Sequence, residues 1–245
     1  MQAIEPIATA ISEAIGRPFH VEHSRDLGGG CINDARILEG AGQKYFVKLN
    51  DSARLAMFEA EAAGLNEIIQ TGTLRTPRPV TFGQAGGQAY LVLEYLELGG
   101  PSGGHADTTL GQGLAALHRT TRPEFGWSRD NTIGSTPQIN TQETDWIEFY
   151  REHRLLYQLQ KAAANGGQSL LRQGENLLVV LPAFFTNYRP LPSLLHGDLW
   201  GGNHGVLPDG TPVIFDPAVY YGDREADVAM TELFGGFGAG FYAAY

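Results

Sequence analysis

LLHGDLWGGN, residues 194–203, is the stretch of this chain that says most about its fold. Within it His196, Asp198 and Asn203 follow the order H-x-D-x-x-x-x-N, directly after apolar residues that favour a short strand. A loop with this spacing can place the Asp and the Asn on one side of a cleft. Phosphoryl transfer uses such a pair, because the Asp accepts the proton of the attacking hydroxyl and the Asn helps to hold Mg²⁺.

A second carboxylate follows in VIFDPA, residues 213–218, thirteen positions after Asn203. If the apolar run before Asp216 folds back as a hairpin, Asp216 meets the same cleft and can also bind metal. Protein kinases have Asp-Phe-Gly at this point, and an Arg where this chain has Gly197. No Ala-Pro-Glu follows, and the helix predicted over Glu225–Phe234 begins too soon for a long activation segment. The sequence therefore predicts a small-molecule acceptor.

Lys48 stands in the apolar stretch YFVKL, residues 45–49, which is predicted to be a strand. A lysine there is costly to bury unless a carboxylate pairs with it. The helix predicted to follow offers Glu59 and Glu61, of which only one can face the cleft because they lie two positions apart. We expect Glu61 to pair with Lys48 and to direct it toward the α- and β-phosphates of ATP. The alternative is a lysine at a strand edge that reaches solvent.

Gly28, Gly29 and Gly30 form a predicted turn ahead of Lys48. Glycines let backbone N–H groups approach phosphates closely, so this turn is predicted to lie over ATP. The spacing is not GxGxxG, and the alternative is an ordinary hairpin turn. Cys31 follows directly, and it is either inert packing or, if the loop moves, an exposed thiol open to oxidation.

The stretch LVLEYL, residues 91–96, precedes a linker rich in Gly, Pro and Ser. We interpret it as a hinge whose backbone binds adenine near Glu94 and Leu96, with a plain core strand as the alternative. The chain is strand-rich before the hinge, and helices dominate after it. The predicted fold class is therefore α+β and bilobal, protein-kinase-like, with an ATP-binding lobe over residues 1–98 and a catalytic and acceptor-binding lobe over residues 99–245.

The remaining pattern predicts where elements begin and end. Helices are predicted over residues 3–15, 53–70, 108–119, 146–165, 170–185 and 225–234. Strands are predicted over residues 20–27, 35–38, 45–49, 79–82 and 89–96, and a short late β block over residues 193–206 and 213–215. Residues 123–144 are predicted to be a polar loop. Asp227 is predicted to be a structural acceptor that braces the catalytic loop.

Composition narrows the classes of partner. With 245 residues, 42% of them apolar, the chain can form one large unit or two lobes around a cleft. A net charge of −10 without a basic cluster argues against nucleic acid or an acidic membrane. A lone cysteine, no signal peptide and no membrane-length apolar run predict a soluble, cytoplasmic protein. No motif specifies an oligomeric state.

With these pieces assembled, the chain resembles the fructosamine kinase (ketosamine 3-kinase) family over nearly its whole length. HGDLW followed by GN and then DPA is more specific than the general kinase pattern. The other segments that carry the resemblance are GGGCI at residues 28–32, FVKLN at 46–50, MFEAEAAGL at 57–65, FGW at 125–127, YG at 221–222 and LFGGF at 233–237.

The resemblance implies ATP-dependent phosphorylation of the 3-hydroxyl of a sugar joined through its C1 to an amine. The 3-phosphate then eliminates and releases the amine, which amounts to deglycation. The resemblance also implies roles for individual residues. Lys48 and Glu61 form the ion pair, and Asp198 is the base. Asn203 and Asp216 bind Mg²⁺. Trp200 is expected to stack on the sugar, or else only to pack the loop. Family members continue past Tyr245 in further helices, so a truncated C-terminal lobe is expected.

Two other readings stay open at this stage. The first is a different small-molecule kinase of the same fold, acting on an aminoglycoside, choline or a plain sugar. The second is a catalytically dead binding or regulatory module. Retention of the lysine, the base and both metal ligands speaks against the second reading, because a dead kinase typically loses at least one of them.

Overall fold

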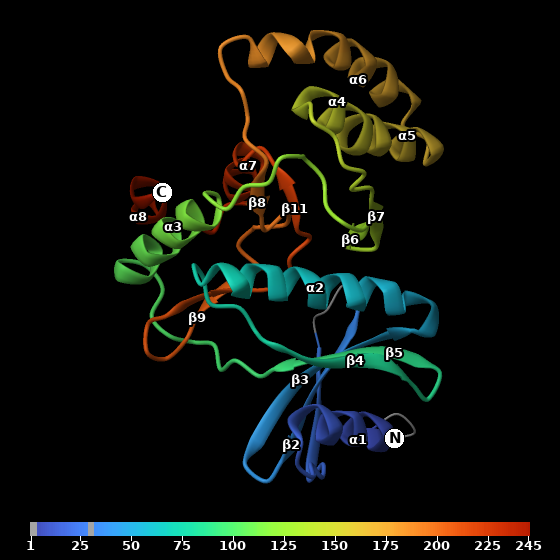
Figure 1. The fold of residues 1–245 in the computed structure, drawn as a ribbon, viewed down its shortest axis with the longest axis vertical. Coiled ribbons are helices and arrows are strands. Elements are labelled where there is room, and N and C mark those ends of the chain that lie inside the picture. Colours follow the sequence, from blue (N-terminus) through green and yellow to red (C-terminus); the bar gives the residue numbers. More distant parts are fainter. Residues whose placement is uncertain (1–3, 29–31) are drawn as a thin grey trace.

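The computed structural model describes residues 4–28 and 32–245, and Figure 1 shows a sheet-based part and a mainly helical part. The first part is a five-stranded antiparallel sheet in the order β1-β2-β3-β5-β4. A helix covers each face of this sheet. The elements are α1 (Ile4–Ile15), β1 (His23–Leu27), β2 (Asp34–Gly40), β3 (Gln43–Asp51), α2 (Leu55–Thr71), β4 (Pro79–Ala85) and β5 (Gln88–Glu94), with the short helix η1 (Ser52–Arg54) before α2.

Side chains alternate between the two faces of the sheet, as the period of a strand requires. Val47 and Leu49 on β3 pack in the cluster that includes α1, whereas Leu91 and Leu93 on β5 pack with residues of α2. Lys48 lies between Val47 and Leu49, so the pleat turns it toward the face that α2 covers. The lysine is thereby aimed at the helix that follows it in sequence.

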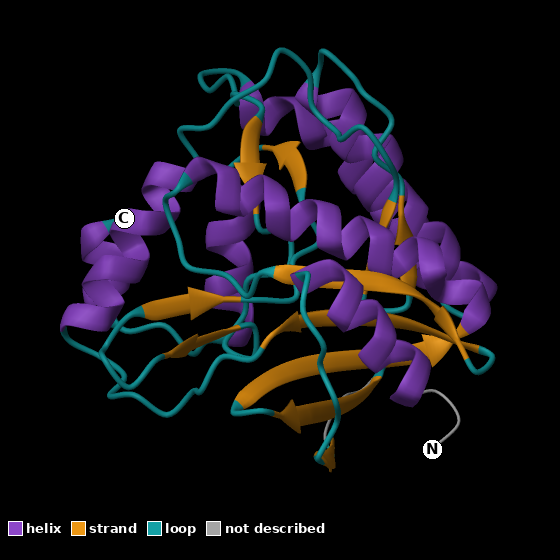
Figure 2. Ribbon diagram, turned by 60° about the horizontal axis from the view of Figure 1, so that its bottom comes forward, coloured by secondary structure: helices purple, strands orange, loops and turns teal. Residues whose placement is uncertain are grey.

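The second part holds the late β elements among helices, and Figure 2 shows how short these strands are beside the large sheet. Strand β8 pairs antiparallel with β11, and β9 forms a hairpin with β10. The elements are α3 (His105–Leu117), β6 (Asn131–Ile133), β7 (Thr136–Gln138), α4 (Trp146–Tyr150), the π-helical segment η2 (Arg151–Leu156), α5 (Tyr157–Ala164), α6 (Gln168–Val180), η3 (Leu181–Phe185), β8 (Ser193–Leu195), β9 (His204–Val206), β10 (Pro212–Ile214), β11 (Tyr220–Gly222), α7 (Glu225–Phe234) and α8 (Ala239–Ala244).

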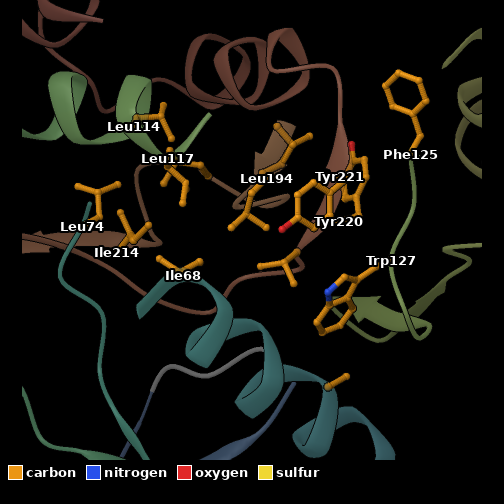
Figure 3. Packing of buried hydrophobic residues seen from close by; sticks show 14 of the residues in the cluster. Ile68, Leu74, Leu114, Leu117, Phe125, Trp127, Leu194, Ile214, Tyr220 and Tyr221 are labelled. Atoms are coloured by element: carbon orange, nitrogen blue, oxygen red, sulfur yellow. The ribbon is translucent and has the colours of Figure 1, made fainter. Parts of the chain in front are cut away.

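One apolar core joins the two parts through α2. Ile68 of α2 is fully buried beside Leu114 and Leu117 of α3 and Leu194 of β8, and Figure 3 shows these side chains converging. The opposite side of α2 packs on the sheet. Helix α2 is therefore the element on which both parts rest, and β8 carries the core directly into the stretch 194–203.

The bilobal α+β class is confirmed, while the polar loop predicted over residues 123–144 was wrong in part. Residues 123–144 are not all loop, because β6 and β7 form a small hairpin there. The helix predicted over residues 146–165 is present, as α4, the π-helical segment η2 and α5 in succession. In the late β block, β9 and β10 form a hairpin, whereas β8 pairs with β11, a strand that was not predicted. Among the described residues, no helix is both long and apolar enough to cross a membrane.

Candidate active site

Lys48 lies between two carboxylates in the cleft. Its Nζ is 2.6 Å from Oε1 of Glu61 and 2.7 Å from Oδ1 of Asp216, and its side chain is only 7% exposed. Burial would lower the pKa of Lys48, but attraction to Glu61 and Asp216 outweighs it, so the pKa lies above its ordinary value. Lys48 is therefore a fixed cation, and of the two glutamates considered from sequence, Glu61 is the one that it meets.

The loop of residues 196–203, called the catalytic loop below, places Asp198 and Asn203 in contact. Nδ2 of Asn203 donates to the backbone oxygen of Asp198 at 2.8 Å and to its Oδ2 at 3.0 Å. Burial raises the pKa of Asp198 to about 6, and the charge of Asp216 adds to the effect, while the bond from Asn203 opposes it. A carboxyl group with a pKa close to neutrality is suited to accept a proton in the reaction and release it afterwards.

Asp227 binds the backbone of this loop through its carboxylate. Its Oδ2 accepts from the backbone N–H of His196 at 2.7 Å and its Oδ1 from that of Gly197 at 2.8 Å, while His118 lies 3.1 Å from Oδ2. Burial alone would raise the pKa of Asp227, but these hydrogen bonds and the nearby His118 and His196 bring it below its usual value. The structure thus contains the brace that the sequence analysis predicted.

Gly197 replaces the kinase arginine for a steric reason. Its φ is +82°, and a Cβ there would lie 2.1 Å from the carbonyl oxygen of Ala218. Ala218 in turn donates its N–H to the carbonyl of His196 at 2.9 Å. The catalytic loop and the Asp216-Pro217-Ala218 turn therefore touch backbone to backbone, and no side chain fits between them.

Asp216 adopts an unusual backbone conformation at the point where two cavities meet. Its φ is +57°, a left-handed value that Asp tolerates better than most residues. One cavity, of about 360 Å³, is lined by the hinge residues Glu94 and Leu96 together with Phe46 and Asp216. Glu94 also pairs with Arg75, which fixes the end of β5. The hinge predicted from sequence thus borders a largely apolar cavity of a size that suits a nucleobase.

The second cavity, of about 350 Å³, is lined by the groups for which catalytic roles are predicted, and is called the catalytic cavity below. Its lining includes the five predicted residues Lys48, Glu61, Asp198, Asn203 and Asp216, with Trp200 at its side. Trp200 is 41% exposed and packs edge to face with Phe234, with ring centroids 6.1 Å apart. The structure therefore brings together residues that lie far apart in the sequence, from β3, α2 and the two late loops.

The donor atoms of this cavity fit Mg²⁺ when it arrives with phosphates. Asn203 commits its amide nitrogen to Asp198, so its amide oxygen is the atom that can bind a cation, and Asp216 offers a carboxylate. In the described part of the chain no group of three or more His, Cys, Asp or Glu side chains could enclose a metal by itself. Mg²⁺ commonly binds one or two protein oxygens together with substrate phosphates and water.

The glycine-rich turn is described only at its edges. Gly28 is exposed after β1, whereas the predictions for Gly29, Gly30 and Cys31 concern residues outside the described part of the chain. Asn50 Nδ2 donates to the carbonyl of Ile32 at 3.1 Å and to Oδ1 of Asn33 at 2.7 Å. Ile32 and Asn33, which are described, also line the catalytic cavity.

The β6–β7 hairpin is a part of the site that the sequence analysis missed. Asn131, Thr132 and Gly134 line the catalytic cavity, and Asn131 donates to the carbonyl of Val219 at 2.8 Å. The available signal was Gly134-Ser135, a two-residue turn between short polar strands. The arrangement as a whole places the predicted base, a fixed cation and the predicted oxygen ligands beside a nucleobase-sized cavity, as transfer of a phosphoryl group from a nucleotide requires.

Comparisons with known proteins match this chain to one family. A family model described as fructosamine kinase matches residues 3–245. A protein named "Probable ketoamine kinase" from Synechocystis is 48% identical, with 98% of this chain and 81% of the relative covered. A chloroplastic protein-ribulosamine 3-kinase from Arabidopsis thaliana is 44% identical, with 94% of this chain and 71% of that protein covered.

Solved structures show the same fold. A candidate fructosamine-3-kinase from Haemophilus somnus superposes with a TM-score of 0.92 at 28% identity, covering 100% of this chain and 82% of that one. A spectinomycin phosphotransferase superposes with a TM-score of 0.56 at 17% identity, covering 100% of this chain and 80% of the other. The second likeness shows the fold alone.

Proposed function

This chain belongs to the fructosamine kinase family, and on that premise we propose that it transfers the γ-phosphoryl group of ATP to the 3-hydroxyl of a ketosamine. The observation that carries the proposal is the catalytic cavity, in which Asp198, Asn203 and Asp216 line one space with the Lys48–Glu61 pair. The resulting 3-phosphate then eliminates, and the amine is freed from its sugar.

Each residue has a separate task in this proposal. Asp198 accepts the proton of the sugar hydroxyl, and Lys48, oriented by Glu61, binds the α- and β-phosphates. Asn203 and Asp216 would hold Mg²⁺, which neutralises charge that develops on the transferred group. Glu94 and Leu96 border the adenine, and Gly28, Gly29 and Gly30 cover the phosphates.

We also propose a role for each lobe, the charge of the acceptor and the location of the protein. Residues 1–98 form the ATP-binding lobe, and residues 99–245 form the catalytic and acceptor-binding lobe. The acidic net charge of −10 suits an acceptor that carries an amine and does not suit nucleic acid or an acidic membrane. A cytoplasmic location stays a prediction, since the similar Arabidopsis protein is named as chloroplastic.

Acceptor profiling tests the proposed function. We expect kcat/KM for a ribulosamine and a fructosamine to exceed that for an aminoglycoside by at least about a hundredfold, because misplacing the reacting hydroxyl relative to the base by about 1 Å can cost that much. The measurement is the rate of ADP release in a coupled assay, at fixed concentrations of ATP and Mg²⁺ and with the concentration of each acceptor varied. Efficient turnover of the aminoglycoside alone would exclude ketosamines and leave a kinase of the same fold. No ADP release with any acceptor would favour the inactive binding module.

Trp200 is expected to serve the acceptor and not ATP. Trp200→Ala should raise KM for the ketosamine by roughly tenfold, because the sugar can no longer stack on an exposed aromatic ring at the cavity. KM for ATP should change by less than about twofold. Steady-state kinetics with each substrate varied in turn provide both values.

Phe234 offers the matched control for this substitution. It packs against Trp200 and is 64% exposed, but it is not among the residues that line the cavity. Phe234→Ala should therefore leave KM for the ketosamine near that of the unmodified protein. Equal effects of the two substitutions would mean that Trp200 only packs the loop.

A further inference from the structure

Glu67 on α2 accepts hydrogen bonds from three side chains of the helical part. Its Oε1 lies 2.8 Å from the hydroxyl of Tyr221 and 2.8 Å from Nη2 of Arg122, and its Oε2 lies 2.6 Å from Nε1 of Trp127. The Glu67 side chain is 15% exposed, and Trp127 and Tyr221 are buried in the core shown in Figure 3.

The three donors are themselves held in place. Tyr221 and Gly126 exchange two backbone hydrogen bonds of 2.8 Å, which fix Trp127 next to Tyr221. The Arg122 guanidinium lies over the Tyr221 ring, 4.8 Å from its centroid. Burial and the neighbouring Glu67 raise the pKa of Tyr221 to about 12, so its hydroxyl keeps its proton and remains a donor. The carboxylate of Glu67 thus meets a preformed set of donors.

Glu67 is one of three contacts that run along α2 at intervals of three residues. Glu61 pairs with Lys48, and a Cβ on Gly64 would lie 2.9 Å from Cγ2 of Val219. Glu67 then meets Tyr221 two positions beyond Val219. Residues spaced in this way fall along one side of a helix. Helix α2 is therefore aligned with the chain that follows Asp216, and Glu67 is the polar anchor at its far end.

We propose that Glu67 is a positioning residue that fastens α2 to the helical part and so keeps Glu61 within hydrogen-bonding reach of Lys48. The proposal rests on the proposed function, because it concerns the same ATP site. Only β11 lies between the Asp216 turn and α7, so no long segment is present there to hold α2. The hydrogen bonds of Glu67 hold α2 in its place. Trp127 of the FGW motif and Tyr221 of the YG motif both donate to Glu67, so the two motifs serve the same contact.

Glu67→Gln tests the proposal through its coupling to Glu61. The amide oxygen of Gln can accept two of the three bonds, and its NH₂ group would face another donor, so the anchor of α2 is weakened and kcat/KM for ATP should fall by about tenfold. In a Glu61→Ala background the same substitution should cost less than about threefold, because there is no longer a pair to position. Thermal unfolding of the four proteins is measured alongside, and the loss of stability should be the same in both backgrounds.

Two further variants keep the test decisive. Glu59→Gln makes the same chemical change on the same helix outside this set of contacts, and it should leave kcat/KM for ATP unchanged. Tyr221→Phe removes one donor and serves if Glu67→Gln does not fold, with an expected loss of about threefold that again disappears in the Glu61→Ala background. Losses that multiply fully in the double variant would make Glu67 a merely structural residue and overturn the proposal, as would unchanged kinetics.

Failure of the proposed function would be visible separately. If the unmodified protein phosphorylates no ketosamine, the proposed acceptor is wrong, and the same cycle is run on the dissociation constant of Mg·ATP measured by calorimetry. The expected pattern is unchanged: weaker binding for Glu67→Gln alone, and little further weakening in the Glu61→Ala background. Full additivity in that measurement would overturn the anchor as well.

Discussion

Replacing Asp198 with Asn is expected to lower kcat by about a hundredfold or more, because loss of a positioned base removes an interaction that is made only in the transition state. Asn has nearly the shape of Asp, and its side-chain oxygen can still accept the bond that Asn203 donates over 3.0 Å. The loop should therefore keep its conformation. The dissociation constant of Mg·ATP should stay within about threefold of that of the unmodified protein. Steady-state ADP release and calorimetric titration provide the two quantities.

Asp209 supplies the control for the same chemical change. It lies in the turn between β9 and β10, where its Oδ1 accepts from the N–H of Thr211 at 2.9 Å, away from the cavity. Asp209→Asn should leave kcat as it is. An Asp198→Asn protein that retained most of its kcat would remove Asp198 from the role of base and would require another acceptor for the hydroxyl proton.

The parts of the site that could be predicted are those whose chemistry is local in sequence. His196, Asp198 and Asn203 lie on a single loop, and their spacing alone brings them to one side of it. Lys48 could be aimed at α2 because strand side chains alternate and the helix follows at once. Glu61 could be chosen over Glu59 only as a preference, and the structure supplies the contact at 2.6 Å.

Contacts between distant segments could not be derived from the pattern. Lys48 and Asp216 are 168 positions apart, and no pattern in the residues around either one predicts the bond between them. The pairing of β8 with β11 is of the same kind, because three-residue strands carry too little alternation to identify a partner. Glu67 is the clearest case, since on a helix facing an unknown neighbour it resembles any solvated glutamate.

Steric requirements were also hidden in the sequence. Gly197 appeared there only as a departure from the kinase arginine, and the structure explains it by the approach of the Ala218 carbonyl. The β6–β7 hairpin escaped notice because its strands are polar, and its buried Asn131 and Gln138 bond to each other and to the Ala218–Val219 backbone. Polar groups that are satisfied internally give no hydrophobic signal, although they shape the catalytic cavity.

The two proposed Mg²⁺ ligands are expected to respond differently to removal. Asn203→Ala should weaken the use of Mg·ATP, and raising Mg²⁺ should restore part of it, because a neutral ligand is lost and the carboxylate remains. Asp216→Ala should abolish productive use of Mg·ATP with almost no recovery, since the charged ligand is gone. Lys48 also loses one of its two carboxylate partners in that variant, although Glu61 still holds it. The measurement is kcat/KM for ATP over a wide range of Mg²⁺ concentration.

The backbone at Asp216 calls for a companion variant. Its φ of +57° is unfavourable for Ala but tolerated by Asn, so Asp216→Asn removes the charge without a backbone penalty. We expect it to be as inactive as Asp216→Ala and to unfold at nearly the temperature of the unmodified protein, which would attribute the loss to the carboxylate. Equal recovery of the Asn203 and Asp216 variants at high Mg²⁺ would mean that the metal roles are assigned wrongly. An active Asp216→Asn protein would place the essential ligand elsewhere in the cavity.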